Sequence, residues 1–543
     1  MEKELLDFIP LKELLALGLH ISLYPQINRG LPRFYDRHHP SMSFIKKNFS
    51  TIFSLKKQLL DKTVCHLYAG IKIPKGVSLS LFTWVMNDGL GDFYAQKEAA
   101  KLLKEHFPSL DIALLGLLHK GVKVAEEPDF TSHYLYYENE EPITLSLIDK
   151  ACVSIMRSSA LVLQMPTYFP DTPALLCKLE QERGKHPVPK YELLGEYGFV
   201  DSTWCHPDTA HRCMGLHFLE KGIMVKKMPV LDLSSLDKLK DKELLKILLG
   251  SSDRQGYARS RRMNLAYFFS SEGAYLYLHA LLKKCSREPE GLDIIASSLG
   301  PLLEALERHI EKEGGFPLFK QYGIKEVEIF FEDTLCRLPI AEEGKTLRLI
   351  QAKNLGSEDF ALLLMASRDC VACRGDRSFS EAVSGDKIYF YDPPYHAKNF
   401  LKDLVALAEN RLGSHKGTVE YLRLSLQLIK PKPSDDPFVE EDHFYQRGES
   451  LYELGERMGR LLADPETLLG MHKLNRILYE EYSVNDFLKG LVARSLLHYQ
   501  HPEIEIFEKI ITDNYIANQL SFSAMVQEIR TLLHPYKNLD LYS

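Results

Sequence analysis

Apolar runs of strand length alternate with amphipathic stretches along much of this chain. An apolar run over residues 77–86 leads into a glycine loop at residues 87–92 and then a helical pattern through residues 96–104. Further apolar runs of strand length cover residues 111–118, 143–148 and 160–165. Strands that alternate with helices predict βαβ units and a doubly wound parallel sheet.

A second alternating region follows an amphipathic helix predicted over residues 235–250. The polar stretch at residues 251–256 separates the two regions, and we place a hinge there. The strands predicted beyond it cover residues 264–269, 292–296, 327–331, 346–350, 370–373 and 387–391. The helices predicted between them cover residues 275–284, 301–312, 358–366 and 378–383.

This pattern predicts four segments and an α/β fold class. An N-terminal extension over residues 1–75 precedes a Rossmann-like domain at residues 76–250. A second Rossmann-like domain covers residues 256–430, and a Pro-rich linker separates it from a helical appendage at residues 438–543. We expect the two Rossmann-like domains to face each other across a cleft.

Composition narrows the class of protein. A chain of 543 residues is long enough for two or three domains. With 67 Lys and Arg against 74 Asp and Glu, the net charge is -7, which argues against nucleic acid as the main partner. We expect no membrane span, because no run of about 18 apolar residues occurs.

Cysteine usage and the N-terminal sequence predict a cytoplasmic protein. The nine cysteines show no short-spaced framework, so reduced thiols are expected. The first residues lack the basic start and apolar stretch of a secretory signal. Export by a system that uses no cleaved signal, as for a bacterial effector, stays open.

The loop at residues 87–92 offers two carboxylates on a tight glycine turn. In open α/β sheets, ligands bind outside the carboxyl ends of the strands, where Asp88 or Asp92 could take a proton from an acceptor group. The alternative is structural, with Asp88 as a turn former and Asp92 as the N-cap of the next helix.

The loop at residues 374–381 offers cations, a hydroxyl and backbone amides at a predicted helix start. A helix N-terminus attracts anions, because its first amides lack partners and its dipole is positive there. Gly375 would let a diphosphate approach, Ser378 would supply a hydroxyl, and Arg374 or Arg377 would supply charge. Asp376 or Glu381 could hold ribose or sugar hydroxyls. The alternative is a capping box of Ser378 and Glu381.

These two loops together resemble the GT-B glycosyltransferases, and locally the protein-arginine rhamnosyltransferase family and similar bacterial enzymes. That family has an Asp-x-x-Gly-Asp loop after its first strand, to which Asp88-Gly89-Leu90-Gly91-Asp92 is similar. It also has an Arg-Gly-acidic-x-Ser-Phe loop at the donor diphosphate, to which Arg374-Gly375-Asp376-Arg377-Ser378-Phe379 is similar. The resemblance implies that Asp88 and Asp92 are the catalytic carboxylates.

Two positions depart from the family pattern. Gly89 stands where the family has Asn, and Arg377 stands where it has a second acidic residue. The resemblance therefore implies the GT-B fold and the reaction class, but neither the rhamnose donor nor the arginine acceptor.

Other residues could serve the donor. Arg259 belongs to a cluster near the predicted hinge that could neutralise a leaving diphosphate, or could form a solvated surface. The other members of that cluster are Arg254, Arg261 and Arg262. Ser271 follows the first strand of the second domain and could touch the donor phosphates or sugar. If amides and arginines carry the leaving charge, no metal or other cofactor is required.

The sequence thus predicts a GT-B-type glycosyltransferase that moves a sugar from a nucleoside-diphosphate donor, bound by the second Rossmann-like domain, to an acceptor at the first. A protein is one option for the acceptor, and the oligomeric state stays open. The alternatives are a GT-B-fold nucleotide-sugar epimerase and a catalytically inactive interaction protein with the same fold.

Overall fold

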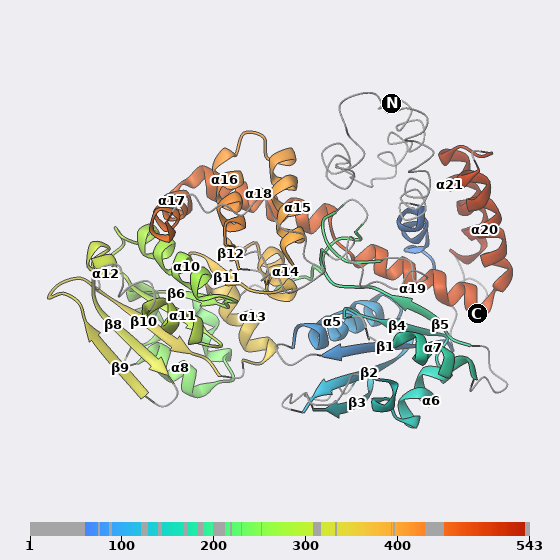
Figure 1. Cartoon of the computed structure of the whole chain (residues 1–543), viewed down its shortest axis with the longest axis horizontal. Helices are drawn as coiled ribbons and strands as arrows, with labels where there is room; N and C mark the ends of the chain where they lie inside the picture. Colours follow the sequence, from blue (N-terminus) through green and yellow to red (C-terminus); the bar gives the residue numbers. More distant parts are fainter. Residues whose placement is uncertain are drawn as a thin grey trace, which may run out of the picture. The chain divides into compact units, whose positions relative to one another are not determined.

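The structure is a computed structural model that describes most of residues 60–537. Within this span it leaves out residues 74–75, 86–89, 121–128, 139–143, 168, 170, 182–187, 199–211, 218–219, 230, 251, 308–316, 332–333, 354, 393, 395–396, 429–449 and 518. The chain forms two compact units (Figure 1). The first contains Met1–Met224 and Glu481–Ser543, and the second contains Val225–Glu480.

The first unit contains a five-stranded parallel sheet with the strand order β3-β2-β1-β4-β5. Its strands are β1 (Ser78–Val85), β2 (Asp111–His119), β3 (Thr131–Tyr137), β4 (Leu161–Gln164) and β5 (Lys190–Leu193). This is the strand order of a Rossmann-type sheet. The Rossmann-like parallel sheet predicted here is therefore confirmed.

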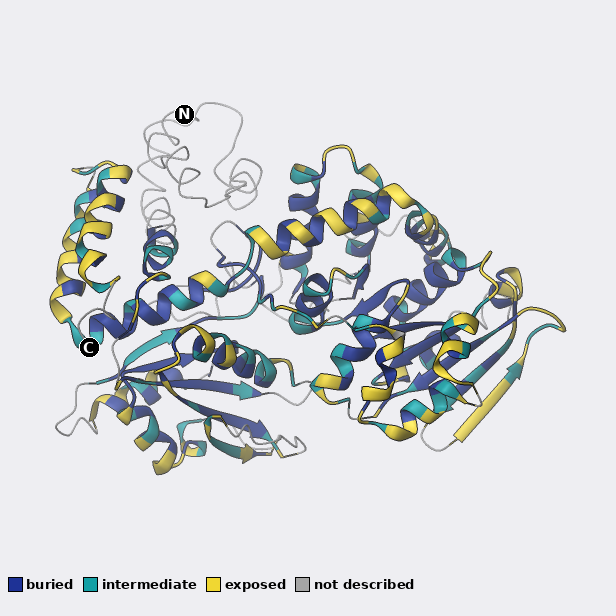
Figure 2. Ribbon diagram, turned by 180° about the vertical axis from the view of Figure 1, so that it is seen from behind, coloured by how far each residue is buried: buried dark blue, intermediate teal, exposed yellow. Residues whose placement is uncertain are grey.

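Helices cover both faces of this sheet, because the strands are apolar on both sides. Phe82 of β1 faces a core formed with α6 (Lys150–Ser158) and α7 (Thr172–Gln181). Val85, at the end of the same strand, packs with Phe93 of α5 (Gly91–His106). Figure 2 shows the central strands of this sheet as mostly buried and the outer sides of its helices as exposed.

The second unit contains a seven-stranded sheet with the order β12-β11-β6-β7-β10-β8-β9. The strands are β6 (Arg261–Ala266), β7 (Gly291–Ala296), β8 (Ile324–Phe331), β9 (Thr334–Pro339), β10 (Lys345–Gln351), β11 (Val371–Cys373) and β12 (Tyr389–Tyr391). All neighbours pair in parallel except β8 and β9, which form an antiparallel hairpin at one edge. The second predicted Rossmann-like sheet is confirmed as well.

The helices of the second unit largely follow the predicted pattern. They are α8 (Lys242–Leu249), α9 (Arg254–Ser260), α10 (Ser271–Lys284), α11 (Gly300–Ala305), α12 (Pro317–Gln321), α13 (Ser357–Ala366), α14 (Asp376–Ser384), α15 (Lys398–Arg411), α16 (Lys416–Leu426), α17 (Leu451–Ala463) and α18 (Pro465–Glu481). α13 packs on β6, and α14 packs against β11 and β12. This last contact places the start of α14 at the carboxyl end of β11.

Three predictions about elements were wrong. The apolar run at residues 143–148 contains a 3-10 turn, η1 (Leu145–Leu147), rather than a strand. The single helix predicted over residues 235–250 is divided into η2 (Leu233–Lys238) and α8, because the Asp241 side chain caps a new helix start by accepting the Leu244 N–H. The hinge predicted at residues 251–256 is occupied by the start of α9, and the units divide earlier, after Met224.

The C-terminal helices do not form one appendage. Helix α17 packs against α10 in the second unit, where Gly455 and Gly459 allow close approach to the side chains of His279 and Lys283. The last helices belong to the first unit: α19 (Asn485–Gln500), α20 (Pro502–Ile516) and α21 (Phe522–Leu533). The predicted linker at residues 431–437 lies outside the described residues.

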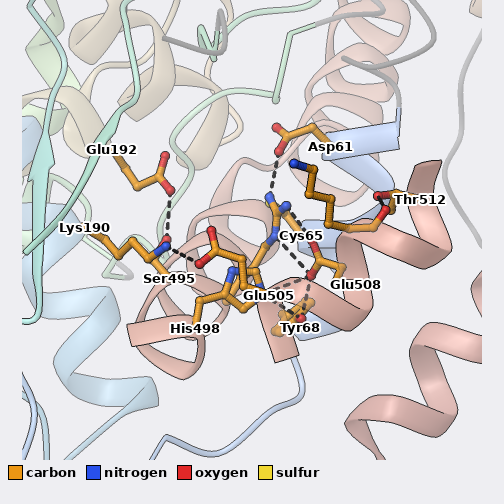
Figure 3. Close-up of polar contacts among 12 residues, drawn as sticks. Asp61, Cys65, Tyr68, Lys190, Glu192, Ser495, His498, Glu505, Glu508 and Thr512 are labelled. Carbon is orange, nitrogen blue, oxygen red and sulfur yellow. Dashed lines mark hydrogen bonds and ion pairs between the residues drawn. The ribbon is translucent and has the colours of Figure 1, made fainter. Parts of the chain in front are cut away.

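A buried polar network holds α19 and α20 in the first unit (Figure 3). Arg494 of α19 pairs with Glu508 of α20 at 2.6 Å and with Asp61 at 2.9 Å, in a helix over residues 60–68. Tyr68 donates to Glu508 at 2.6 Å, and Ser495 donates to Glu192 of β5 at 3.1 Å. Burial opposes ionisation of Glu508, but Arg494 and His498 outweigh it and lower its pKa to about 2.

The two passages of the chain near the unit boundary lie side by side. Ile223 N–H donates to the Tyr482 carbonyl at 2.7 Å, and Val484 N–H donates to the Ile223 carbonyl at 2.9 Å. Gly222 makes this approach possible, because its φ is +100° and a Cβ there would lie 2.3 Å from the Tyr482 carbonyl oxygen. Among the described residues, no helix is long and apolar enough to cross a membrane.

Candidate functional site

The first unit gathers polar residues at the point where its strand order reverses. β2 and β3 lie on one side of β1, whereas β4 and β5 lie on the other. Ligands of open parallel sheets bind outside the carboxyl ends of the strands at such a point. In this unit, that point lies between the ends of β1 and β4.

Asp92 lies at this reversal point, near the start of α5. Leu90 is the N-cap residue, so Asp92 is not the N-cap that the structural alternative assumed. Its carboxylate accepts a hydrogen bond from the Thr167 hydroxyl. Asp88, the other predicted catalytic carboxylate, lies outside the described residues, so its role stays a prediction.

Thr167 and Glu196 join Asp92 from the ends of the next two strands. Thr167 follows β4 and is buried, and Glu196 follows β5. The Thr167 hydroxyl lies 2.8 Å from a Glu196 carboxylate oxygen as well as within hydrogen-bonding distance of Asp92. A threonine hydroxyl carries one hydrogen. It can therefore donate to only one of these two carboxylates at a time.

In the second unit, the strand order reverses between β6 and β11. β7 and the strands beyond it lie on one side of β6, and β11 and β12 lie on the other. The loop after β6 leads into α10, which begins at Ser271, and the loop after β11 contains Arg374 and Gly375 and leads into α14, which begins at Asp376. The strands pair through Ala266 and Ala372, so both loops leave the same edge of the sheet.

The start of α10 is already occupied by a carboxylate of the chain itself. Asp392, which follows β12, accepts the N–H groups of Phe269 and Ser270, both at 2.9 Å. The Ser270 hydroxyl in turn accepts the Gly273 N–H at 2.9 Å. Asp392 is buried, and this burial raises its pKa to about 6 against the opposing effect of those hydrogen bonds.

The start of α14 is built differently, because its N-cap residue is Gly375 and no side chain caps it. Helix α14 begins at Asp376, two residues earlier than predicted. A Cβ at Gly375 would meet nothing within 4 Å, and its φ of -125° suits any residue. The backbone therefore does not require glycine here, and the open space lies at the positive end of the helix.

Ser378 shapes this loop from within. Its hydroxyl accepts the N–H groups of Arg374 and Gly375, both at 3.2 Å, and donates to the Gly375 carbonyl at 2.9 Å. These bonds use the one hydroxyl hydrogen. Ser378 therefore fixes the loop rather than offering a donor hydroxyl to a ligand, which corrects its predicted role.

The two arginines near the start of α14 contact different neighbours. The Arg374 guanidinium stacks 5.5 Å from the ring centre of Tyr267 and 5.4 Å from that of Phe269, so it bridges the loops after β6 and β11. Arg377 lies in the first turn of α14, 5.8 Å from the Phe360 ring centre. Arg374 directly precedes Gly375 and Arg377 follows it by two residues, so both residues add positive charge near this helix start.

Glu381 is buried, with its carboxylate directed at cations of the chain. One oxygen lies 2.7 Å from the Lys226 ammonium and 3.2 Å from the Arg377 guanidinium. Glu381 does not complete a capping box. Its burial also keeps it from touching sugar or ribose hydroxyls, which is the role that the sequence had suggested.

The predicted arginine cluster lies at the wrong edge of the sheet. Arg259 is in α9, before β6, whereas Ser271 follows β6, and a strand of six residues spans about 20 Å. Arg261 pairs with Asp293 at 3.2 Å, and Arg262 pairs with buried Asp369. The cluster stabilises the fold at the amino end of β6, and Arg259 is not brought to the donor loop.

The structure thus brings Ser271, Arg374, Gly375, Asp376, Arg377 and Ser378 to one edge of the second sheet. Sequence reasoning missed Thr167 and Glu196 in the first unit. Thr167 could have been found, because it comes just after an apolar run that ends at Pro166. Glu196 could not, because β5 (Lys-Tyr-Glu-Leu) is too short and polar to be recognised. Among the described residues, no group of three or more His, Cys, Asp or Glu side chains could hold a metal ion.

No protein-family model and no curated protein matches the sequence. Solved structures do share features with it. An alpha,alpha-trehalose-phosphate synthase (UDP-forming) from Burkholderia vietnamiensis is 9% identical and has a TM-score of 0.39, with 79% of this chain and 99% of that chain covered. Medicago truncatula UGT71G1 complexed with UDP-glucose is 12% identical with a TM-score of 0.39, covering 77% of this chain and 98% of that one.

Anabaena Alr3699/HepE in complex with UDP and glucose is also similar, at 12% identity and a TM-score of 0.34, with 77% of this chain and 99% of that chain covered. The two strand orders given above identify both sheets as Rossmann-like.

Proposed function

We propose that this chain is a glycosyltransferase of the GT-B type that uses a nucleoside-diphosphate sugar. The observation that carries the proposal is the start of α14, at the strand-order reversal of the second sheet. There an uncapped helix end with Gly375 at its N-cap lies between Arg374 and Arg377. A diphosphate suits such a place, because amide N–H groups, the helix dipole and guanidinium groups all favour negative charge.

The loop residues would act mainly on the leaving group. As the bond between the anomeric carbon and the diphosphate oxygen breaks, its electron pair goes to the diphosphate. The α14 amides and the two arginines would stabilise that charge, which grows in the transition state. Asp376, at the first position of α14, would hold a ribose or sugar hydroxyl.

The first unit would serve the acceptor. A nucleophilic atom of the acceptor forms the new bond to the anomeric carbon, and its proton passes to Asp92 as general base. Thr167 holds the Asp92 carboxylate in place from the end of β4. Asp88 would share this task, as the resemblance implies. Neither the sugar nor the acceptor follows from these residues, and a protein acceptor is one option.

Product analysis with radiolabelled nucleotide sugars tests the proposal. We expect the label to move to an acceptor, whereas isomerised nucleotide sugar would support an epimerase. Asp92→Asn should lower turnover by about a hundredfold or more while the nucleotide affinity stays unchanged. Asp111→Asn is the matched control, because Asp111 is exposed at the opposite, amino end of β2. Equal turnover in wild type and Asp92→Asn would contradict the role of Asp92.

A further inference from the structure

The Thr167 hydroxyl lies between two carboxylates that come from different elements. Asp92 is in the first turn of α5, and Glu196 follows β5. The Thr167 Oγ1 atom is within hydrogen-bonding distance of an Asp92 oxygen and 2.8 Å from Glu196 Oε1. Thr167 is buried, whereas Asp92 and Glu196 are each half-buried. The two carboxylates therefore belong to residues with some access to solvent, and the hydroxyl between them belongs to a residue with almost none.

The backbone holds Thr167 and Glu196 in place independently of these carboxylates. The Thr167 carbonyl accepts a hydrogen bond at 2.8 Å from the side-chain amide of Gln164, which is buried at the end of β4. Both main-chain groups of Gly195, next to Glu196, are hydrogen-bonded to the segment at residues 212–214, at 2.8 and 3.0 Å. The contact between the hydroxyl and Glu196 is therefore supported by the backbone at this sheet edge.

A threonine hydroxyl has one hydrogen and donates to one acceptor at a time. While both neighbours are ionised, the hydrogen bonds to one carboxylate, and the other carboxylate faces the hydroxyl oxygen. This limit arises from Thr167 alone, so it holds whatever other groups contact Asp92 and Glu196. Because a hydrogen bond to a charged acceptor is stronger than one to a neutral acceptor, the hydrogen favours a carboxylate that stays ionised over one that has been protonated.

We propose that Thr167 and Glu196 are positioning residues for Asp92, and that the Thr167 hydrogen turns from Asp92 to Glu196 as Asp92 gains a proton. Before the reaction, the hydroxyl donates to ionised Asp92. When Asp92 takes the proton of the acceptor, its charge is lost, and the Thr167 O–H rotates to donate to ionised Glu196. The acceptor's proton stays on Asp92 and the hydrogen stays on Thr167, so only the hydrogen bond changes. The role of Asp92 as base rests on the proposed function, whereas the shared hydrogen does not.

This exchange keeps one charge-assisted hydrogen bond at Thr167 in both states of Asp92. Without the Glu196 carboxylate, protonation of Asp92 would replace a strong hydrogen bond by a weaker one, which opposes proton transfer. With Glu196, the hydroxyl regains a charged acceptor and the cost is smaller. Glu196 therefore favours the protonated form of Asp92 and makes Asp92 a stronger base.

Thermal melts of the full chain test the shared hydrogen without any substrate. Glu196→Gln supplies an amide N–H that can donate to the Thr167 oxygen, which leaves the hydroxyl hydrogen to Asp92. Thr167→Val therefore removes two hydrogen bonds in the Glu196→Gln background but one in wild type. We expect it to lower the melting temperature by about 2 °C or more beyond its effect in wild type. Other contacts of Glu196 cancel in this comparison.

Asp92→Asn should act in the same way, because it resembles the neutral state of Asp92 and leaves the hydroxyl hydrogen to Glu196. Glu180→Gln is the matched control, since Glu180 is an exposed carboxylate of α7 in the same unit. Thr167→Val should lower the melting temperature equally with and without this control substitution. Equal losses in all four backgrounds would show that the hydroxyl serves a single carboxylate, and would overturn the proposal.

Kinetics with radiolabelled UDP-, GDP- and dTDP-sugars test the consequence for turnover. Glu196→Gln should lower kcat by about tenfold and leave KM for the donor within about twofold, because it affects proton transfer rather than donor binding. Thr167→Ser keeps the hydroxyl and should keep kcat within about threefold, whereas Thr167→Val should resemble Glu196→Gln. Unchanged kcat in Glu196→Gln would overturn the proposal. Melts as expected, but no transfer from any donor by wild type, would support the shared hydrogen and contradict the proposed function.

Discussion

Asp392 shows at the scale of one residue how the second unit distinguishes two helix starts. Its carboxylate accepts the N–H groups of Phe269 and Ser270, which lead directly into α10, so this helix start already has an anion of the chain itself. Helix α14 begins at the same edge of the sheet, and its N-cap residue is a glycine without a side-chain cap. Of these two adjacent positive ends, the one at α14 is therefore the better candidate for an external anion.

Asp392→Asn should change the pH dependence of stability. Because burial raises the pKa of Asp392 from 3.8 to about 6, the folded state holds its proton more tightly than the unfolded state does. Asp392 therefore contributes fully to the free energy of unfolding below pH 4. This contribution is lost as the pH rises through about 6. A rise of this size corresponds to about 3 kcal/mol.

Thermal melts of wild type and Asp392→Asn between pH 4 and pH 8 check this expectation. As the pH rises to about 6, the free energy of unfolding of the variant should increase relative to that of wild type. Above about pH 6 the difference should stay constant. Parallel pH profiles for the two proteins would show that Asp392 does not titrate in this range.

Residue roles were harder to predict from the sequence than residue positions. The spacing of Arg374, Gly375 and Ser378 indicated a helix start, which the structure confirms within two residues. The direction of the Ser378 hydroxyl and the burial of Glu381 depend on neighbours far along the chain, such as Lys226. Four arginines close in sequence suggested a shared site, but ion pairs with Asp293 and Asp369 fix two of them at the other sheet edge.

At the scale of elements, the open start of α14 predicts that one substitution will raise helix stability and lower nucleotide affinity. Gly375→Ser should stabilise α14 by a few tenths of a kcal/mol, because serine caps a helix better than glycine. The same side chain would occupy the space that an anion needs, so nucleotide affinity should fall by about tenfold. Thermal melts and calorimetry measure the two effects separately.

Gly356→Ser provides the matched control. Gly356 is the N-cap residue of α13, also has no side-chain cap, and also has nothing within 4 Å of an added Cβ. It should stabilise its helix in the same way and leave nucleotide affinity unchanged. Equal affinities for both variants would remove the evidence that α14 binds the donor.

The polar network around Glu508 predicts that α19 and α20 unfold together with the first unit. Glu508→Gln should destabilise this unit by about 3 kcal/mol, because Arg494 loses a buried partner and the Tyr68 hydroxyl loses its carboxylate acceptor. Since the pKa of Glu508 is lowered to about 2, its contribution is present above pH 5 and declines on acidification towards pH 2. Calorimetric melts at neutral and acidic pH measure both effects.

Glu505→Gln is the control on the same helix. Glu505 pairs with Lys190 at 2.5 Å, but its side chain is 47% exposed, so loss of the pair should cost little. If both variants melt alike, the network does not anchor α20.

Element prediction succeeded where strands are apolar and failed where they are polar or short. β1, β2 and β7 are mostly apolar and were predicted almost in full. β3, β5 and β9 were missed, because edge strands need not be apolar. The helical tail was predicted as helices, but its division between two units follows from contacts with α10 and with residues 60–68 that no local pattern encodes.

At the scale of the whole molecule, two Rossmann-like sheets each place polar residues at their strand-order reversal. The first offers Asp92 with Thr167 and Glu196, and the second offers the start of α14 with its two arginines. The α/β class and the two sheets could be predicted from the alternation of strands and helices. The arrangement of the two domains across a cleft stays a prediction.

The central claim is that the second unit binds a nucleoside-diphosphate sugar at the start of α14. Isothermal titration calorimetry of the full chain against UDP-, GDP- and dTDP-sugars tests it most directly. We expect one of these donors to bind with a dissociation constant in the micromolar range, about −8 kcal/mol, and to bind about tenfold more weakly to Arg374→Ala. Absence of binding by every donor in the panel would contradict the account.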